Sequence, residues 1–185
     1  QMVSRFNGAN ENGTLGSALY PASATRDSLY GNTELWSGLE NITPVFKLTG
    51  LATELTYKLV FFASRAGVTD NRETRYTVTG ATEAMVDLDA VNNVSGVATV
   101  EGMAPDGAGE ITVALSPGPN NNNANHFTYL GVVRLDLSDG TSLLMDFGAS
   151  GTPTDTEEPP PPTAWNNIVT AVGISDTGAV EGLVS

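Results

Sequence analysis

The sequence predicts an all-β protein, an antiparallel β-sandwich of jelly-roll type with little helix. Apolar and polar residues alternate with a period of two in several short runs, as in strands with one buried face. Turn signals such as Asn12-Gly13, Pro105-Asp106-Gly107 and Asp139-Gly140 separate these runs. The 20 glycines and 10 prolines among 185 residues argue against a helical bundle. Short strands separated by turns are typical of sandwiches and barrels.

The alternating runs follow one another along the chain. In Leu55–Ser64, Tyr57, Leu59 and Phe61 share one face, and the second half is apolar on both faces. One helical turn is expected within Ala22–Tyr30. The other predicted strands are Val45–Thr49, Thr74–Thr79, Val97–Val100, Glu110–Leu115, Phe127–Leu137 and Thr141–Phe147. The residues expected to be buried are Tyr57, Leu59, Phe61, Tyr76, Val78, Val100, Ile111 and Val113.

Composition divides the chain into three parts. Residues 1–147 are expected to form the β-sandwich body. Residues 148–163 read GASGTPTDTEEPPPPT and are interpreted as a proline-rich linker or loop, because consecutive prolines favour an extended polyproline II spacer. Residues 164–185 are expected to be a C-terminal strand segment that completes this sandwich or a neighbouring one.

Charge and residue content exclude several classes of function. Lys and Arg total 8 against 21 Asp and Glu, a formal net charge of −13. A phosphate backbone would be repelled, so we expect no nucleic-acid partner. No apolar run approaches the roughly 20 residues of a membrane span, so no membrane insertion is expected. The chain has no cysteine and one histidine, His126, which excludes thiol chemistry and any site with two imidazoles.

The sequence contains none of the common catalytic motifs. It has no Gly-x-Ser-x-Gly, no phosphate-binding loop and no His-Glu-x-x-His. Paired carboxylates such as Asp70 with Glu73, or Asp27, could serve a glycosidase. Such pairs arise by chance among 21 acidic residues. We therefore expect no catalytic residues and a non-enzymatic protein.

A stretch from Leu48 to Leu135 carries a family resemblance. Its motifs are SRxGxxDNRETxYxVxG, then PDxxGEI, then YLG. They resemble a jelly-roll β-sandwich module of secreted bacterial proteins, which often stands in multidomain chains with polysaccharide-active or cell-surface parts. The resemblance implies an extracellular or cell-surface location and supplies no catalytic residues.

The family motifs stand in a circularly shifted order. In the family, the module begins with a strand ending in Asp-Phe-Gly, continues through Trp-Asn-Asn and ends near Tyr-Leu-Gly. Here Asp146-Phe147-Gly148 and Trp165-Asn166-Asn167 follow Tyr129-Leu130-Gly131, and joining Ser185 to Gln1 restores the family order. Three explanations stay open: one period of a tandem array, a subunit completed by a neighbour's strand, or a circular permutant.

This order favours a structural function. We expect a non-enzymatic repeat module or subunit of a surface filament or adhesin stalk, joined head to tail to copies of itself. Strand complementation between neighbouring copies is one way in which they could be joined. The alternative is a carbohydrate-binding module of a secreted polysaccharide-active protein, with polysaccharide as partner. The residues expected in the assembly segment are Met2, Val3, Phe6, Trp165, Val180, Leu183 and Val184.

Two groups of residues are candidates for contacts. Arg and carboxylate groups close in sequence form pairs that fix a loop, and the loop residues in question are Arg65, Asp70, Asn71, Arg72 and Glu73. A sugar or partner contact by the same groups is the alternative. Exposed aromatic rings stack on sugar rings, and the loop aromatics proposed for this contact are Trp36, Tyr30 and Tyr20.

Calcium is the one metal ion that the sequence suggests. Asp136 and Asp139 lie three residues apart at a polar turn. Calcium takes hard oxygen ligands from such loops. Position 12 counted from Asp136 is Phe147, so the segment lacks the glutamate of an EF-hand loop. We expect no organic cofactor, with a structural calcium ion as the one alternative.

Overall fold

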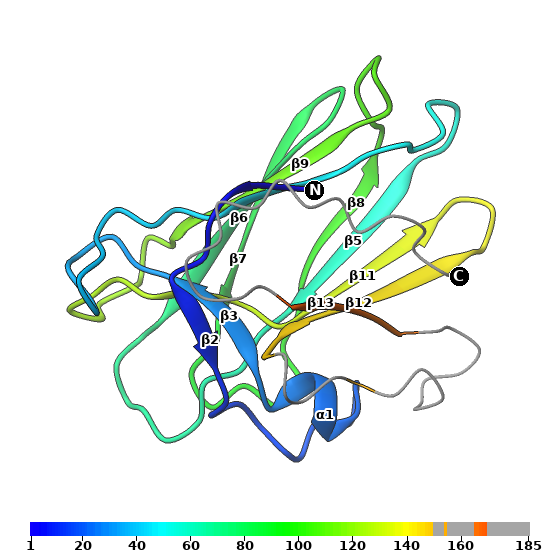
Figure 1. Cartoon of the computed structure of the whole chain (residues 1–185). Helices are drawn as coiled ribbons and strands as arrows, with labels where there is room; N and C mark the ends of the chain where they lie inside the picture. Colours follow the sequence, from blue (N-terminus) through cyan, green and yellow to red (C-terminus); the bar gives the residue numbers. More distant parts are fainter. Residues whose placement is uncertain (150–153, 155–164, 170–185) are drawn as a thin grey trace.

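A computed structural model describes residues 1–149, 154 and 165–169. Within them the protein is a jelly-roll-like β-sandwich, and its single helix is the four-residue α1 (Ala22–Thr25). Two five-stranded sheets face one another, and a three-stranded sheet lies beside them (Figure 1). No helix in the described part of the chain is long and apolar enough to cross a membrane.

The first large sheet is antiparallel throughout. Its strands, in spatial order, are β1 (Met2–Ser4), β4 (Val45–Leu48), β9 (Ile111–Pro117), β6 (Glu73–Thr79) and β7 (Glu83–Asp89). The second sheet contains β13 (Trp165–Val169), β12 (Ser142–Gly148), β11 (Val132–Leu137), β5 (Tyr57–Phe62) and β8 (Ala98–Met103). Its one parallel pair joins β12 to β13, at the sheet edge.

The small third sheet closes one side of the sandwich. It contains β10 (Thr128–Leu130), β3 (Ser28–Gly31) and β2 (Gly8–Asn10), all antiparallel. The predicted strand Phe127–Leu137 is in fact two strands, because the chain passes from this sheet to the second large sheet at Gly131. The Gly131 amide donates to the Phe62 carbonyl, and the Gly131 carbonyl accepts from the Phe147 amide.

The hydrophobic core lies between the two large sheets. All eight residues that were expected to be buried are buried, which confirms the predicted strand faces. Phe61 and Tyr76 stack across the sandwich with their ring centroids 4.4 Å apart and their planes 4° from parallel. The Tyr76 hydroxyl donates to the Tyr129 carbonyl at 2.7 Å, so the one polar atom of this ring pair is satisfied.

A smaller apolar cluster covers the outer face of the second sheet. Trp165 and Tyr20 meet edge to face, with ring centroids 6.0 Å apart, and Tyr20 also packs on Phe62. Because Phe62 lies on the face of β5 opposite Phe61, this cluster explains why the second half of that strand is apolar on both faces. Trp165 is 2% exposed and pairs with Leu144 of the same chain.

The strands β2, β3 and β7 lie outside the segments that the sequence singled out. In β7, Ala84, Val86 and Leu88 alternate with exposed residues, but the strand carries acidic residues and lies at a sheet edge. The strands β2 and β3 have only three and four residues, too few for a recognisable period. Gly148, the first residue assigned to the linker, is the last residue of β12. Most of residues 148–163 and all of residues 170–185 lie outside the described part of the chain.

Candidate functional site

The candidate site is built on a tight hairpin between β3 and β4. Trp36 and Leu39 exchange backbone hydrogen bonds of 2.8 and 2.9 Å. Ser37 and Gly38 between them have φ angles of 50° and 79°, and a two-residue turn with two positive φ angles matches the twist of a hairpin. The backbone that carries Trp36 is therefore well defined, while its side chain stays 44% exposed.

Two buried amide side chains hold the base of this hairpin. Asn32 Nδ2 donates to the carbonyls of Glu34 at 2.7 Å and Leu39 at 3.0 Å. Asn32 Oδ1 accepts from Asn7 Nδ2 at 2.5 Å, and Asn7 Nδ2 also lies 3.3 Å from the Trp36 carbonyl. Both amides are buried. Buried amides of this kind fix a loop because an unmade bond would leave a desolvated polar group.

An aromatic cluster supports the Trp36 ring. The Trp36 indole meets the Phe127 ring edge to face, with centroids 5.3 Å apart and planes at 87°. Tyr30 meets the same ring at 5.5 Å and 89°. Phe127 also contacts Tyr129, and the Arg72 guanidinium carbon lies 5.4 Å from the Phe127 ring centroid. Trp36 and Tyr30, both predicted as sugar contacts, thus belong to one cluster.

The asparagine-rich loop 118–127 lies beside the hairpin and is ordered by its own amides (Figure 1). Asn121 Nδ2 donates to the carbonyls of Glu73 and Phe127, each at 2.9 Å. Asn123 Oδ1 accepts from the Asn125 amide at 3.1 Å. Asn125 Nδ2 reaches the Leu35 carbonyl of the hairpin at 3.1 Å. Asparagine readily makes such turns because its side chain bonds backbone groups nearby.

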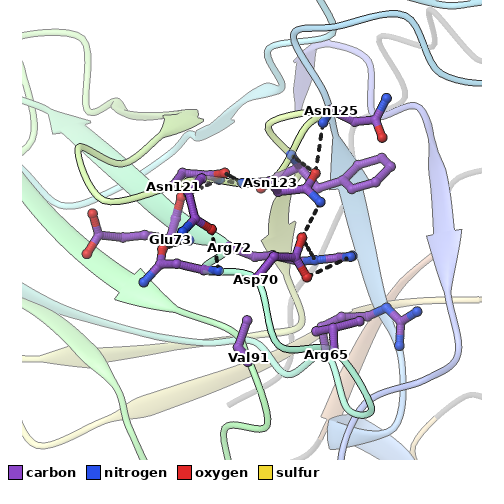
Figure 2. A network of polar contacts seen from close by, with 12 residues as sticks. Arg65, Asp70, Arg72, Glu73, Val91, Asn121, Asn123 and Asn125 are labelled. Atoms are coloured by element: carbon purple, nitrogen blue, oxygen red, sulfur yellow. Dashed lines mark hydrogen bonds and ion pairs between the residues drawn. The ribbon is translucent and has the colours of Figure 1, made fainter.

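Arg72 and Asp70 form the polar centre beneath this loop (Figure 2). Arg72 donates to both oxygens of Asp70, from Nε at 3.1 Å and from Nη2 at 3.3 Å, and its Nη1 donates to the Tyr129 hydroxyl at 2.7 Å. Asn123 Nδ2 also donates to Asp70. Burial opposes the charge on Asp70, but the hydrogen bonds from Asn123 and Arg72 hold the pKa of Asp70 below its usual value.

The other three residues predicted for this loop have separate contacts. Asn71 Nδ2 donates to Asp89 at 3.0 Å, and Glu73 Oε1 accepts from the Asn120 amide at 2.9 Å. Arg65 Nη1 donates to the neighbouring Ala66 carbonyl. Figure 2 shows the Arg65 guanidinium apart from the Asp70 carboxylate. The loop is thus held by one ion pair and by several hydrogen bonds that amide groups donate. Most of its charged groups therefore already have hydrogen-bond partners within the protein.

Polar side chains lie in the hairpin segment and in the asparagine-rich loop beside it. His126 Nδ1 lies 3.2 Å from Thr33 Oγ1 and 3.9 Å from Glu34 Oε1. The imidazole and the Glu34 carboxylate are 41% and 62% exposed. His126 also has a positive φ of 48°, a conformation that is uncommon outside glycine and in which histidine, asparagine and aspartate are enriched. An imidazole, a carboxylate and a side-chain amide therefore belong to the two segments that carry Trp36 and its partner Phe127.

Tyr20 does not belong to this site. It is 8% exposed and packs against Phe62 and Trp165 on the outer face of the second sheet. Its ring has no free face for a ligand, and its neighbours differ from those of Trp36. The sequence placed Tyr20 in a loop but could not show that this loop folds over an apolar sheet face.

The two aspartates proposed for calcium have other contacts. Asp136 Oδ1 accepts from Arg134 Nε and Ser142 Oγ, each at 2.6 Å. Asp139 Oδ1 accepts from the Thr141 amide at 2.8 Å, and this hydrogen bond lowers the pKa of Asp139. No group of three or more acidic or histidine side chains with metal-binding geometry occurs among the described residues. Calcium at this turn stays a prediction.

The predicted assembly segment is only partly described. Met2 is half-buried against the core, Phe6 is 4% exposed and Val3 is 53% exposed. Trp165 lies against its own chain, as described above. Val180, Leu183 and Val184 lie outside the described residues. Head-to-tail assembly and strand exchange between copies stay predictions.

No protein-family model matches this chain, and no curated protein matches it. Among solved structures, the chain is similar to Xyl-CBM35, described in complex with a glucuronic acid-containing disaccharide, at 15% identity and a TM-score of 0.38 over 77% of this chain and 87% of that one. It is also similar to the CBM35 from Cellvibrio japonicus Abf62, at 14% identity and a TM-score of 0.39 over 80% of this chain and 99% of that one. At these TM-scores the likeness assigns neither a family nor a ligand to this chain.

Proposed function

We propose that this chain is a carbohydrate-binding module that binds polysaccharide against Trp36. The observation that carries the proposal is an indole that is 44% exposed although its backbone is fixed by a tight turn. An aromatic ring held in this way loses little conformational entropy on binding. Its flat apolar face suits the axial C–H groups of a pyranose ring, and large aromatic side chains dominate the energetics of such contacts.

The groups around the indole suit the hydroxyls of a sugar. Asn125, His126, Thr33 and Glu34 offer hydrogen-bond donors and acceptors on the hairpin segment and on the loop beside it. Small-molecule sites typically combine an apolar contact with a few polar groups that point toward the ligand. The protein carries a net charge of −13, and Glu34 adds a carboxylate at the site itself. Both charges disfavour an anionic glycan, so the proposed ligand is a neutral polysaccharide.

The proposal is tested by affinity electrophoresis of the purified chain in gels that contain xylan, galactomannan, mixed-linkage β-glucan or polygalacturonate. We expect retardation by at least one neutral polysaccharide and none by polygalacturonate. Trp36→Ala should weaken binding about thirtyfold, the effect of a central aromatic residue in an interface. The matched control is Met85→Ala, which truncates another exposed apolar residue, on β7.

Three outcomes would contradict the proposal. The first is migration that none of the neutral polysaccharides changes. The second is retardation that Trp36→Ala leaves intact, because binding would then occur elsewhere on the surface. Equal weakening by Trp36→Ala and Met85→Ala would also count against a specific site.

A further inference from the structure

A second polar cluster lies at the other end of β3 from the hairpin that carries Trp36. Asp27 immediately precedes β3, and Asp146 lies in β12. Thr154 belongs to the segment after β12. The exposed fractions of these three residues are 1%, 2% and 2%. Three polar side chains, two of them acidic, are therefore removed from solvent together.

Hydrogen bonds and packing define the geometry of this cluster. Thr154 Oγ1 donates to Asp146 Oδ2 at 2.8 Å, and Asp27 Oδ2 accepts from the Ala149 amide at 2.8 Å. A Cβ atom at Gly148 would collide with the Asp27 carboxylate. Because residues two apart on a strand share a face, Gly148 and Asp146 lie on one side of β12. The Asp27 carboxylate therefore lies over the same face as that of Asp146.

One oxygen of this cluster has no partner. Asp146 Oδ1 is shielded from solvent and accepts no hydrogen bond from the part of the chain that the structure describes. Within the described residues, Asp146 also takes part in none of the ion pairs. A carboxylate removed from water in this way is costly unless it is paired with a cation, coordinates a metal ion or takes up a proton. Burial and the charge of Asp27 raise the pKa of Asp146 to about 7, although the Thr154 hydrogen bond opposes the shift.

We propose that Asp27 and Asp146 bind a calcium ion, with the unpartnered Asp146 Oδ1 directed at it and the Thr154 hydroxyl oxygen nearby. The donors are all hard oxygen atoms, which calcium prefers. Calcium is coordinated by about six to eight oxygen atoms in a flexible arrangement, and backbone carbonyls and water can be among them. Two carboxylates can therefore supply the charged ligands, and carbonyl and water oxygens would complete the coordination. The bound ion would join β12 to the start of β3 and to Thr154, and it would place a positive charge beside the Asp146 carboxylate.

The proposal is tested on the full chain by thermal unfolding at pH 8, in EDTA and in calcium chloride, with sodium chloride added to equal ionic strength. For a dissociation constant of about 10⁻⁴ to 10⁻³ M, typical of extracellular calcium sites, about 10 mM calcium should raise the Tm by about 3 to 10 °C. Calorimetric titration should show one site. Magnesium at the same concentration should have a smaller effect, because it demands near-ideal octahedral geometry.

Two variants locate the ion. Asp146→Asn should abolish the calcium-dependent rise in Tm, and Asp136→Asn should leave it unchanged. The reverse pattern would place calcium at the Asp136 turn and overturn the proposal. A wild-type Tm that is equal in EDTA and in calcium overturns it without any variant. If Asp146→Asn does not fold, this wild-type measurement together with the Asp136→Asn result still decides the question. None of these outcomes depends on whether the chain binds polysaccharide.

Discussion

The buried amide of Asn32 is expected to hold the hairpin that presents Trp36. Asn32→Ala removes two donated bonds, to the carbonyls of Glu34 and Leu39, and one accepted bond from Asn7. Each bond contributes about 0.5 to 1.5 kcal/mol, and each buried group left unsatisfied costs about 1 to 3 kcal/mol. Because the carbonyls can be partly rehydrated near the surface, we expect a total loss of about 2 to 4 kcal/mol in the free energy of unfolding.

The loss is measured by urea denaturation, followed by circular dichroism and by tryptophan fluorescence. A domain of this size has a stability of about 5 to 15 kcal/mol, so most of the Asn32→Ala protein should stay folded. The matched control is Asn10→Ala. The Asn10 amide donates only to Ser28 Oγ at 3.3 Å and accepts two long bonds from Asn12, and its loss should cost under about 1 kcal/mol.

Binding should change together with stability in this variant. If the hairpin loosens, Trp36 loses its fixed orientation and polysaccharide affinity should fall. An Asn32→Ala protein as stable as Asn10→Ala, with normal binding, would refute the reasoning that these amides position the indole.

Three further outcomes are expected. Arg72→Ala should cost about 3 kcal/mol of unfolding free energy in urea titrations, because it leaves Asp70 partly buried without its cation. Arg75→Ala should shift the urea midpoint much less than Arg72→Ala, since the Arg75 side chain is 35% exposed and Arg72 only 12%; a shift as large as that of Arg72→Ala would contradict this. In EDTA, the unfolding free energy should fall by up to about 4 kcal/mol as pH rises from 3.8 to about 7, because folded Asp146 keeps a proton that the unfolded chain releases. Asp146→Asn should remove that slope.

Much of the sandwich could be predicted because a strand with one buried face leaves a period of two in the sequence. The runs that became β6 and β9 show this period clearly, and their inward residues lie in the core. The period cannot be recognised in β2, which has three residues. In β7 the alternation is present but weak, because the inward Ala84 is small and the outward Met85 is apolar.

The candidate site was predictable only in part. Trp36 could be named because an aromatic residue in a polar loop is unusual. Its partner Phe127 could not be named, because the contact depends on how two distant loops meet. The asparagine run before Phe127 has low complexity in the sequence, yet its order comes from bonds to Glu73 and Asp70, which lie far away along the chain. Local composition contains no information about such bonds.

Tryptophan fluorescence during polysaccharide titration tests the central claim most directly. The chain has two tryptophans, of which Trp36 is 44% exposed and Trp165 is 2% exposed, so a ligand that stacks on the candidate site reaches only one of them. With a neutral polysaccharide that retards the chain in gels, we predict a saturable blue shift of the emission that disappears in Trp36→Phe while Trp165 emission stays constant. Saturable binding without any change in the emission of Trp36 would contradict the account.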